Sequence, residues 1–141
     1  MKPRFIKVKS RYRERWKEYL PGYWISSCGR WWSVKSEKIL KQDRNDSGYY
    51  RAQICVNGVK KKVFTHIAVC DKFGDCNGKT LPDKLRAYGL SIDHISRRKD
   101  NNSVFNLEIV PHAENVTRFY IKKRERELRN EFENPDEEIF G

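Results

Sequence analysis

The chain has 141 residues, of which 38% are hydrophobic and 13% aromatic, so we expect a modest folded core and exclude disorder throughout. Thirty Lys and Arg against 19 Asp and Glu give a net charge of +11, which favours a polyanionic partner. Because aromatic residues alternate with basic ones, we predict nucleic acid rather than a merely solvated surface. No apolar stretch is long enough to span a bilayer or resembles a signal peptide, so we expect no membrane partner and a cytoplasmic location.

The first 20 residues form a basic leader, with eight Lys or Arg residues against Glu14 and Glu18. An ordered helix is the alternative, but the positive excess favours a flexible arm that lies along phosphates. We place the arm proper at residues 1–15.

Residues 23–63 show the pattern of an antiparallel sheet. Strands are predicted at 23–26 and 31–34, on either side of a turn at Cys28-Gly29. Apolar residues then alternate over 50–56, and Asn57-Gly58 is typical of a type I′ hairpin turn. Trp31 and the neighbouring Trp32 are predicted to lie in the core of this small sheet.

A short helix is predicted after the sheet, with Thr65 as its N-cap and Ile67, Val69 and Phe73 on its buried face. His66 is interpreted as a packing residue rather than a ligand. A second short helix over 83–88 has only weak support.

The last third of the chain predicts two strands and a long helix. The strands cover 92–95 and 107–110, and the polar loop 96–105 connects them. Pro111 suits the first turn of a helix that we expect to continue to about Phe132. Residues 135–141 form an acidic tail.

Two polar residues at the end of the first of these strands have the chemistry of phosphodiester hydrolysis. Asp93 supplies a hard oxygen ligand for a divalent metal, and His94 supplies a base that works near neutral pH. Asn115, early in the predicted helix, can supply a second ligand, with His112 on the same face as a phosphate contact or a plain exposed histidine. Asn106 can use its amide to hold the loop against the second strand.

These residues resemble a known module. Asp93-His94-Ile95, Asn101-Asn102, Asn106-Leu107 and Glu114-Asn115 look like the HNH, or ββα-metal, unit of phage-type homing endonucleases. The resemblance implies that Asp93 and Asn115 bind Mg²⁺ or Mn²⁺, that His94 is the general base, and that Asn106 is structural. Ser96, Arg97 and Arg98 replace the acidic-Gly-Asn loop that is more common there.

The resemblance extends upstream to residues 16–73, which are similar to the NUMOD-type sheet module that precedes HNH units and contacts DNA. It implies a sheet module at 16–74 and a nuclease module at 75–134. The fold class is therefore predicted as α+β: a small N-terminal antiparallel β-sheet, then a ββα-metal unit and a C-terminal helix.

Basic and amide side chains near the sheet and the HNH loop are the predicted DNA contacts. The same lysines would also suit solvated strand edges that discourage pairing with other strands. Given a nuclease site, we favour contact with DNA phosphates for several of them. Arg51 and Gln53 are candidates for contacts with DNA bases. The predicted set is Arg30, Lys35, Arg51, Gln53, Lys60, Lys61, Lys62, Arg97, Arg98 and Arg118.

We therefore expect an endonuclease that cleaves one or both strands of duplex DNA as a monomer or homodimer. The alternative is a DNA-binding module that has lost cleavage and acts in regulation or within a larger phage complex. The four cysteines lack CxxC spacing, which favours reduced side chains over structural zinc, although Cys70 and Cys76 stay open as ligands.

Overall fold

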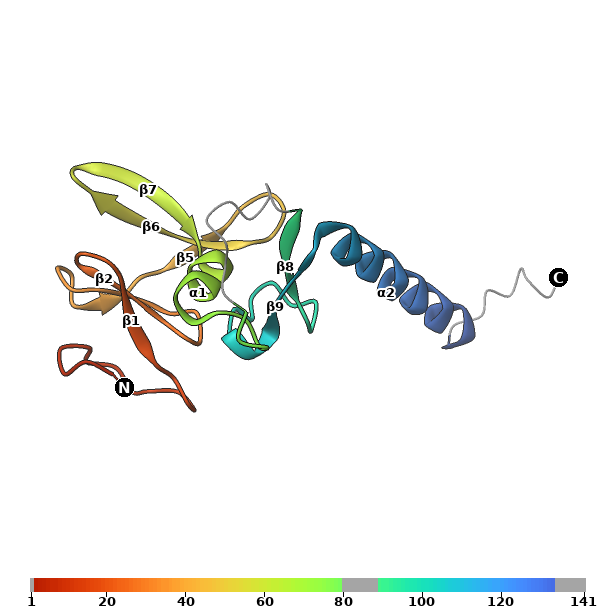
Figure 1. Cartoon of the computed structure of the whole chain (residues 1–141), viewed down its shortest axis with the longest axis horizontal. Helices are drawn as coiled ribbons and strands as arrows, with labels where there is room; N and C mark the ends of the chain where they lie inside the picture. Colours follow the sequence, from red (N-terminus) through yellow and green to blue (C-terminus); the bar gives the residue numbers. More distant parts are fainter. Residues whose placement is uncertain (1, 80–88, 134–141) are drawn as a thin grey trace.

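A computed structural model describes residues 2–79 and 89–133 of the chain. The first four strands form one antiparallel sheet in the order β1-β2-β3-β4 (Figure 1). Their bounds are β1 (Trp16–Leu20), β2 (Tyr23–Ser26), β3 (Trp31–Ser33) and β4 (Lys38–Ile39). Trp31 and Trp32 are 0% and 1% exposed, which confirms that they belong to the core.

The next three strands form a separate sheet, so the single predicted sheet is divided in two. They are β5 (Gln42–Arg44), β6 (Tyr50–Val56) and β7 (Val59–Phe64), paired antiparallel in that order. Burial alternates along β6 as predicted, with Ala52 and Ile54 inside. Asn57 and Gly58 have φ angles of 51° and 77° and close the β6–β7 hairpin, as a type I′ turn requires.

The basic leader packs against the first sheet, and its prediction as a flexible arm is wrong. Ile6 is 1% exposed and lies in a small apolar cluster with Trp16 and Trp32. The buried side chain of Glu14 accepts hydrogen bonds from Arg30, which ties the leader to the turn before β3. Apolar burial and an ion pair therefore outweigh the charge repulsion that favours a free arm.

Helix α1 (Thr65–Phe73) follows β7, but its predicted N-cap is wrong. Phe64 holds the cap position without a side-chain hydrogen bond, and Thr65 is the first helical residue. The Thr65 hydroxyl is engaged elsewhere, because it accepts a 3.0 Å bond from Trp31 Nε1 and donates to Gln42. The buried face carries Val69 as predicted, whereas Ile67 and Phe73 are only half-buried.

The last part of the structure has the ββα order that the motif implies. Strands β8 (Leu90–His94) and β9 (Leu107–Pro111) pair antiparallel and lead into α2 (His112–Glu133). A short 3-10 turn precedes β9. Pro111 ends the strand rather than starting the helix, and the predicted helix at 83–88 lies outside the described residues.

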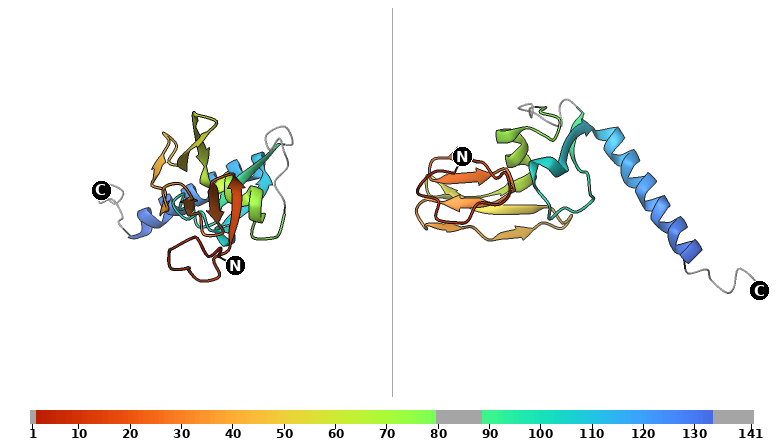
Figure 2. Two further views of the ribbon diagram at one scale, coloured as in Figure 1. Left: turned by 90° about the vertical axis from the view of Figure 1, so that its left-hand side faces the viewer. Right: turned by 90° about the horizontal axis from the view of Figure 1, so that it is seen from below.

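One core joins the sheets, α1 and the ββα unit. Ile54, Val69 and Leu107 belong to the same buried cluster, although they come from β6, α1 and β9. The buried carboxylate of Asp75 accepts a 2.8 Å hydrogen bond from the Ile109 amide, which fixes the segment after α1 to β9. Helix α2 extends away from this body (Figures 1 and 2).

Candidate active site at the junction of β8 and α2

Asp93 and His94 lie at the end of β8 and are each 5% exposed. Asn115 lies in the first turns of α2, which follows β9 directly. All three line one pocket of about 570 Å³. The structure therefore brings together the two predicted ligands and the predicted base.

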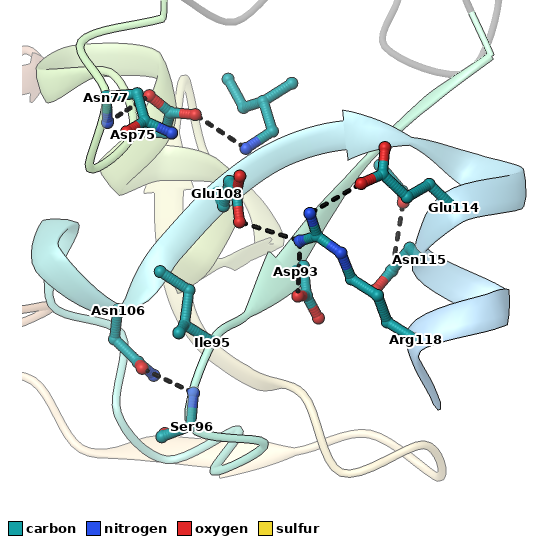
Figure 3. Close-up of polar contacts among 12 residues, drawn as sticks. Asp75, Asn77, Asp93, Ile95, Ser96, Asn106, Glu108, Glu114, Asn115 and Arg118 are labelled. Atoms are coloured by element: carbon teal, nitrogen blue, oxygen red, sulfur yellow. Dashed lines mark hydrogen bonds and ion pairs between the residues drawn. The ribbon is translucent and has the colours of Figure 1, made fainter. Parts of the chain in front are cut away.

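The Asp93 carboxylate is held by two arginines. Arg97 Nη1 lies 2.7 Å from Oδ1, and Arg118 Nη1 lies 3.4 Å from Oδ2. Arg118 also bonds Glu108 at 2.8 Å and Glu114 at 2.7 Å, and Figure 3 shows its side chain between the three carboxylates. The hydrogen bond to Glu108 is the main reason that the pKa of Arg118 is raised.

His94 has a defined hydrogen-bond geometry. Its Nε2 lies 2.7 Å from Oδ1 of Asn102, while the Asn102 amide nitrogen donates to the Lys99 carbonyl at 3.2 Å. An amide oxygen only accepts, so Nε2 carries the proton and Nδ1 keeps a free lone pair. Burial lowers the pKa of His94, against the opposing effects of the Asn102 hydrogen bond and the Asp93 charge. The ring is therefore a neutral base at pH 7.

Two aromatic rings lie beside His94, one from the residue before β6 and one from α1. Tyr49 stacks on His66 with centroids 4.8 Å apart, and the rings of His66 and His94 are 5.4 Å apart. Lys99 Nζ lies 4.5 Å from the Tyr49 ring centroid. Burial lowers the pKa of His66 to about 3, so its ring is neutral too. His66 is a packing residue, as predicted, and one of the rings that it packs against is that of His94, the predicted base.

Asn106 lies outside the lining of this pocket and makes two hydrogen bonds across the loop. Its amide nitrogen donates to the Asn101 carbonyl at 2.8 Å. Its Oδ1 accepts from the Ser96 amide at 2.9 Å, the contact drawn in Figure 3. These contacts close the β8–β9 loop. Contacts of this kind suit the structural role predicted for Asn106.

The predicted DNA contacts fall into two groups. Gln53, Lys60 and Lys61 are exposed on the second sheet, and Lys35 is exposed in the turn between β3 and β4. The others bond carboxylates of the protein: Arg51 and Lys62 bond Asp43, Arg98 bonds Asp100, Arg97 and Arg118 bond Asp93, and Arg30 bonds Glu14. Arg30 is 16% exposed in its side chain, so its contacts serve the fold rather than DNA.

Sequence reasoning missed several residues around the pocket. Tyr49 and His66 are far from His94 in the sequence, and no local pattern links them. Two further cations, Arg126 and Arg129, line the pocket from α2 beside Lys122, and Lys99 lines it from the loop. Positive charge at positions 118, 122 and 126 repeats every four residues, so it marks one helix face that could have been found from the sequence.

The donor set suits a hard divalent cation. Asp93 and Asn115 line one pocket with a carboxylate and an amide group, and the Asn115 amide nitrogen donates to Ser91 Oγ at 3.1 Å. The two guanidinium groups on Asp93 show that this carboxylate attracts positive charge. Within residues 2–79 and 89–133, no three His, Cys, Asp or Glu side chains gather as a metal site. Burial raises the pKa of Cys70 to about 12, which disfavours the thiolate that zinc needs.

Comparisons with known proteins point to one kind of enzyme. No family model matches the chain. The chain is 34% identical over 104 residues to DNA endonuclease I-HmuI of Bacillus phage SP01 and 28% identical over 108 residues to an uncharacterized HNH endonuclease of Acanthamoeba polyphaga mimivirus. Each alignment covers 72% of this chain, but only 55% and 30% of those relatives.

A solved structure that describes DNA binding and cleavage by the HNH homing endonuclease I-HmuI is also similar. It matches with a TM-score of 0.64 and 28% identity, over 85% of this chain and 68% of the other. None of the helices in the described part of the chain could cross a membrane.

Proposed function

This chain belongs to the HNH homing endonuclease family, and from that premise we propose that it is a metal-dependent endonuclease that hydrolyses phosphodiester bonds of duplex DNA. One observation carries the proposal: Asp93, His94 and Asn115, from β8 and α2, line a single pocket. An acidic ligand, an amide ligand and a neutral imidazole are the groups that metal-assisted phosphodiester hydrolysis needs.

His94 is the proposed general base. Its Nδ1 takes the proton of the attacking water, and Asn102 holds the ring in the tautomer that leaves Nδ1 free. Burial keeps the pKa of His94 below its usual range, so the base stays unprotonated at pH 7. Tyr49 and His66 pack on the ring and limit its rotation.

Asp93 and Asn115 would hold one Mg²⁺ or Mn²⁺ ion. Bound there, the ion supplies neutralising charge for the reacting phosphate and for the 3′ oxygen that leaves. A divalent ion with only two protein ligands completes its coordination with water and phosphate oxygens, which suits a pocket that must also admit DNA.

The DNA backbone is proposed to lie along the basic face of α2 and the β6–β7 hairpin. Lys99, Lys122, Arg126 and Arg129 are at the pocket, and Lys60 and Lys61 are exposed on β7. Contacts of this kind neutralise phosphates and release counterions, so DNA affinity should fall steeply as salt rises.

Cleavage of supercoiled plasmid tests the proposal. With Mg²⁺ or Mn²⁺ the protein should convert supercoiled DNA to nicked or linear forms, and EDTA should stop the reaction. Asp93→Asn should abolish conversion while gel-shift affinity in EDTA is kept. Binding without any metal-dependent cleavage by the unaltered chain would contradict the proposal and favour a DNA-binding module. Sequencing the ends made on a DNA library would then define the target.

A further inference from the structure

Arg97 has a backbone conformation that few side chains adopt. Its φ angle is 66°, in the left-handed region that favours glycine, yet the residue carries one of the largest side chains. From this position the guanidinium enters the active-site pocket, where Nη1 lies 2.7 Å from Asp93 Oδ1. The conformation thus places a cation on the proposed metal ligand.

The Arg97 guanidinium also has unused hydrogen-bonding capacity. Its Nε and Nη2 atoms are buried and find no acceptor among the residues that the structure describes. Buried donors without acceptors are rare, because each has lost its hydration without gaining a partner. Two free donors of one guanidinium can bind two oxygens of a phosphate.

Arg118, the other arginine on Asp93, is anchored differently. It bonds Glu108 and Glu114 at 2.8 and 2.7 Å, and its contact with Asp93 is the longest of the three at 3.4 Å. The one carboxylate that Arg97 contacts in the described part of the chain is Asp93. Of the two, Arg97 is therefore the arginine that can leave Asp93 without giving up other ion pairs.

A divalent ion and Arg97 compete for the same carboxylate. The buried Asp93 needs a positive partner, and either cation can supply it. A metal bound at Oδ1 would take the oxygen that Arg97 contacts, and the two positive charges would repel each other. The cost of displacing Arg97 falls when a phosphate receives the guanidinium.

We propose that Arg97 exchanges Asp93 for a DNA phosphate, so that DNA binding frees the carboxylate for the divalent metal. The inference rests on the proposed function, because it takes Asp93 as a ligand. Lys99 and Lys122 line the same pocket and favour the entry of the phosphate. The metal therefore binds weakly to the free protein and tightly to the complex with DNA, which limits metal-dependent cleavage to bound substrate.

Mn²⁺ affinity measured by electron paramagnetic resonance tests the exchange without relying on cleavage. The parent protein is the full chain with His94→Ala, so that a short mixed-sequence duplex stays intact. Arg97→Asn removes the charge with a residue that tolerates positive φ, Arg97→Gly removes it with no backbone cost, and Arg97→Lys keeps it. Arg98→Asn is the matched control, because Arg98 carries equal charge in the same loop but bonds Asp100.

Without DNA, Arg97→Asn and Arg97→Gly should each bind Mn²⁺ about tenfold more tightly than the parent, the scale of a partly buried charge pair. Arg97→Lys should stay near the parent value, and Arg98→Asn should shift affinity by at most about twofold. Adding the duplex should strengthen Mn²⁺ binding much more in the parent than in Arg97→Asn. Thermal unfolding confirms that each variant is folded.

The exchange is overturned if the neutral Arg97 variants bind Mn²⁺ no more tightly than the parent, or if the duplex helps all variants equally. Asp93→Asn in the same parent separates this failure from that of the proposed function. If Asp93→Asn weakens Mn²⁺ binding while the Arg97 variants change nothing, only the exchange is wrong. If Asp93→Asn has no effect, the metal site and the exchange are both wrong.

Discussion

His94 Nε2 lies 2.7 Å from Oδ1 of Asn102, and this contact decides which nitrogen of the imidazole can act as a base. The Asn102 amide is itself oriented by its bond to the Lys99 carbonyl, so its oxygen faces the ring. A residue of the β8–β9 loop thereby sets the tautomer of a residue at the end of β8.

Replacing Asn102 should therefore impair cleavage more than binding. Asn102→Leu keeps the approximate volume but removes the acceptor, so His94 loses its tautomer preference. We expect a loss of about 10- to 100-fold in the single-turnover cleavage rate, the usual effect of removing an orienting partner of a histidine. Asn101→Ala, at the exposed neighbour, is the control. An unchanged rate in Asn102→Leu would show that the contact does not orient the base.

The close approach of Gly29 to Asn102 links the first sheet to the same loop. A Cβ on Gly29 would lie 2.9 Å from the Asn102 Cβ, whereas Gly58, also at positive φ, has nothing within 4 Å. Gly58→Ala should cost only the backbone strain, about 1 kcal/mol, and Gly29→Ala about 3 kcal/mol because the clash is added. Urea unfolding gives both values. Equal losses would mean that the contact is readily relieved.

The ion pair of Glu14 and Arg30 should stabilise the packed leader. Their side chains are 0% and 16% exposed, so Glu14→Gln removes the carboxylate charge from a largely buried guanidinium, whose Nη2 still donates to the Lys9 carbonyl. We expect a loss of about 3 kcal/mol in the free energy of unfolding. Glu37→Gln, in the exposed pair with Lys7, should barely change it. If Glu14→Gln changed the free energy of unfolding as little as Glu37→Gln, the ion pair of the leader would contribute little to the stability of the fold.

Local patterns predicted the elements whose structure depends on near neighbours. Alternating burial along β6 and the Asn57-Gly58 turn follow from strand geometry and from backbone conformations that few residues adopt. The order β8, β9, α2 and the shared pocket of Asp93, His94 and Asn115 follow from motif spacing.

The features that the sequence did not predict depend on contacts between distant segments. Thr65 is a residue type that often caps helices, but its hydroxyl bonds Trp31, which lies in β3. The many charged residues of the leader gave no sign that Ile6 would be buried. It is buried because it packs against Trp16 and Trp32. The stacking of Tyr49 and His66 beside His94 likewise exists only once the segment before β6, α1 and β8 have packed together.

Buried, neutral His66 should make the fold sensitive to acid. Its pKa is about 3 in the folded protein against 6.5 as the ordinary value, so the unfolded chain takes up a proton first as the pH falls. The contribution of neutral His66 to the free energy of unfolding is therefore complete above pH 6.5 and is lost as the pH falls from 6.5 towards 3. This group alone lowers the free energy of unfolding by up to about 1.4 kcal/mol per pH unit in that range.

Urea midpoints between pH 7 and pH 4 measure this slope, with about half-unit steps sufficient to define it. His66→Gln should flatten it, whatever its effect on absolute stability. A slope that is the same in both proteins would contradict a neutral His66.

The single-turnover cleavage rate of His94→Ala with Mg²⁺ or Mn²⁺ tests the central claim most directly. Loss of the general base should lower the rate by about 10²- to 10⁴-fold, while gel-shift affinity for duplex DNA stays within about threefold of the unaltered chain. A His94→Ala protein that cleaves DNA as fast as the unaltered chain would contradict the proposed active site.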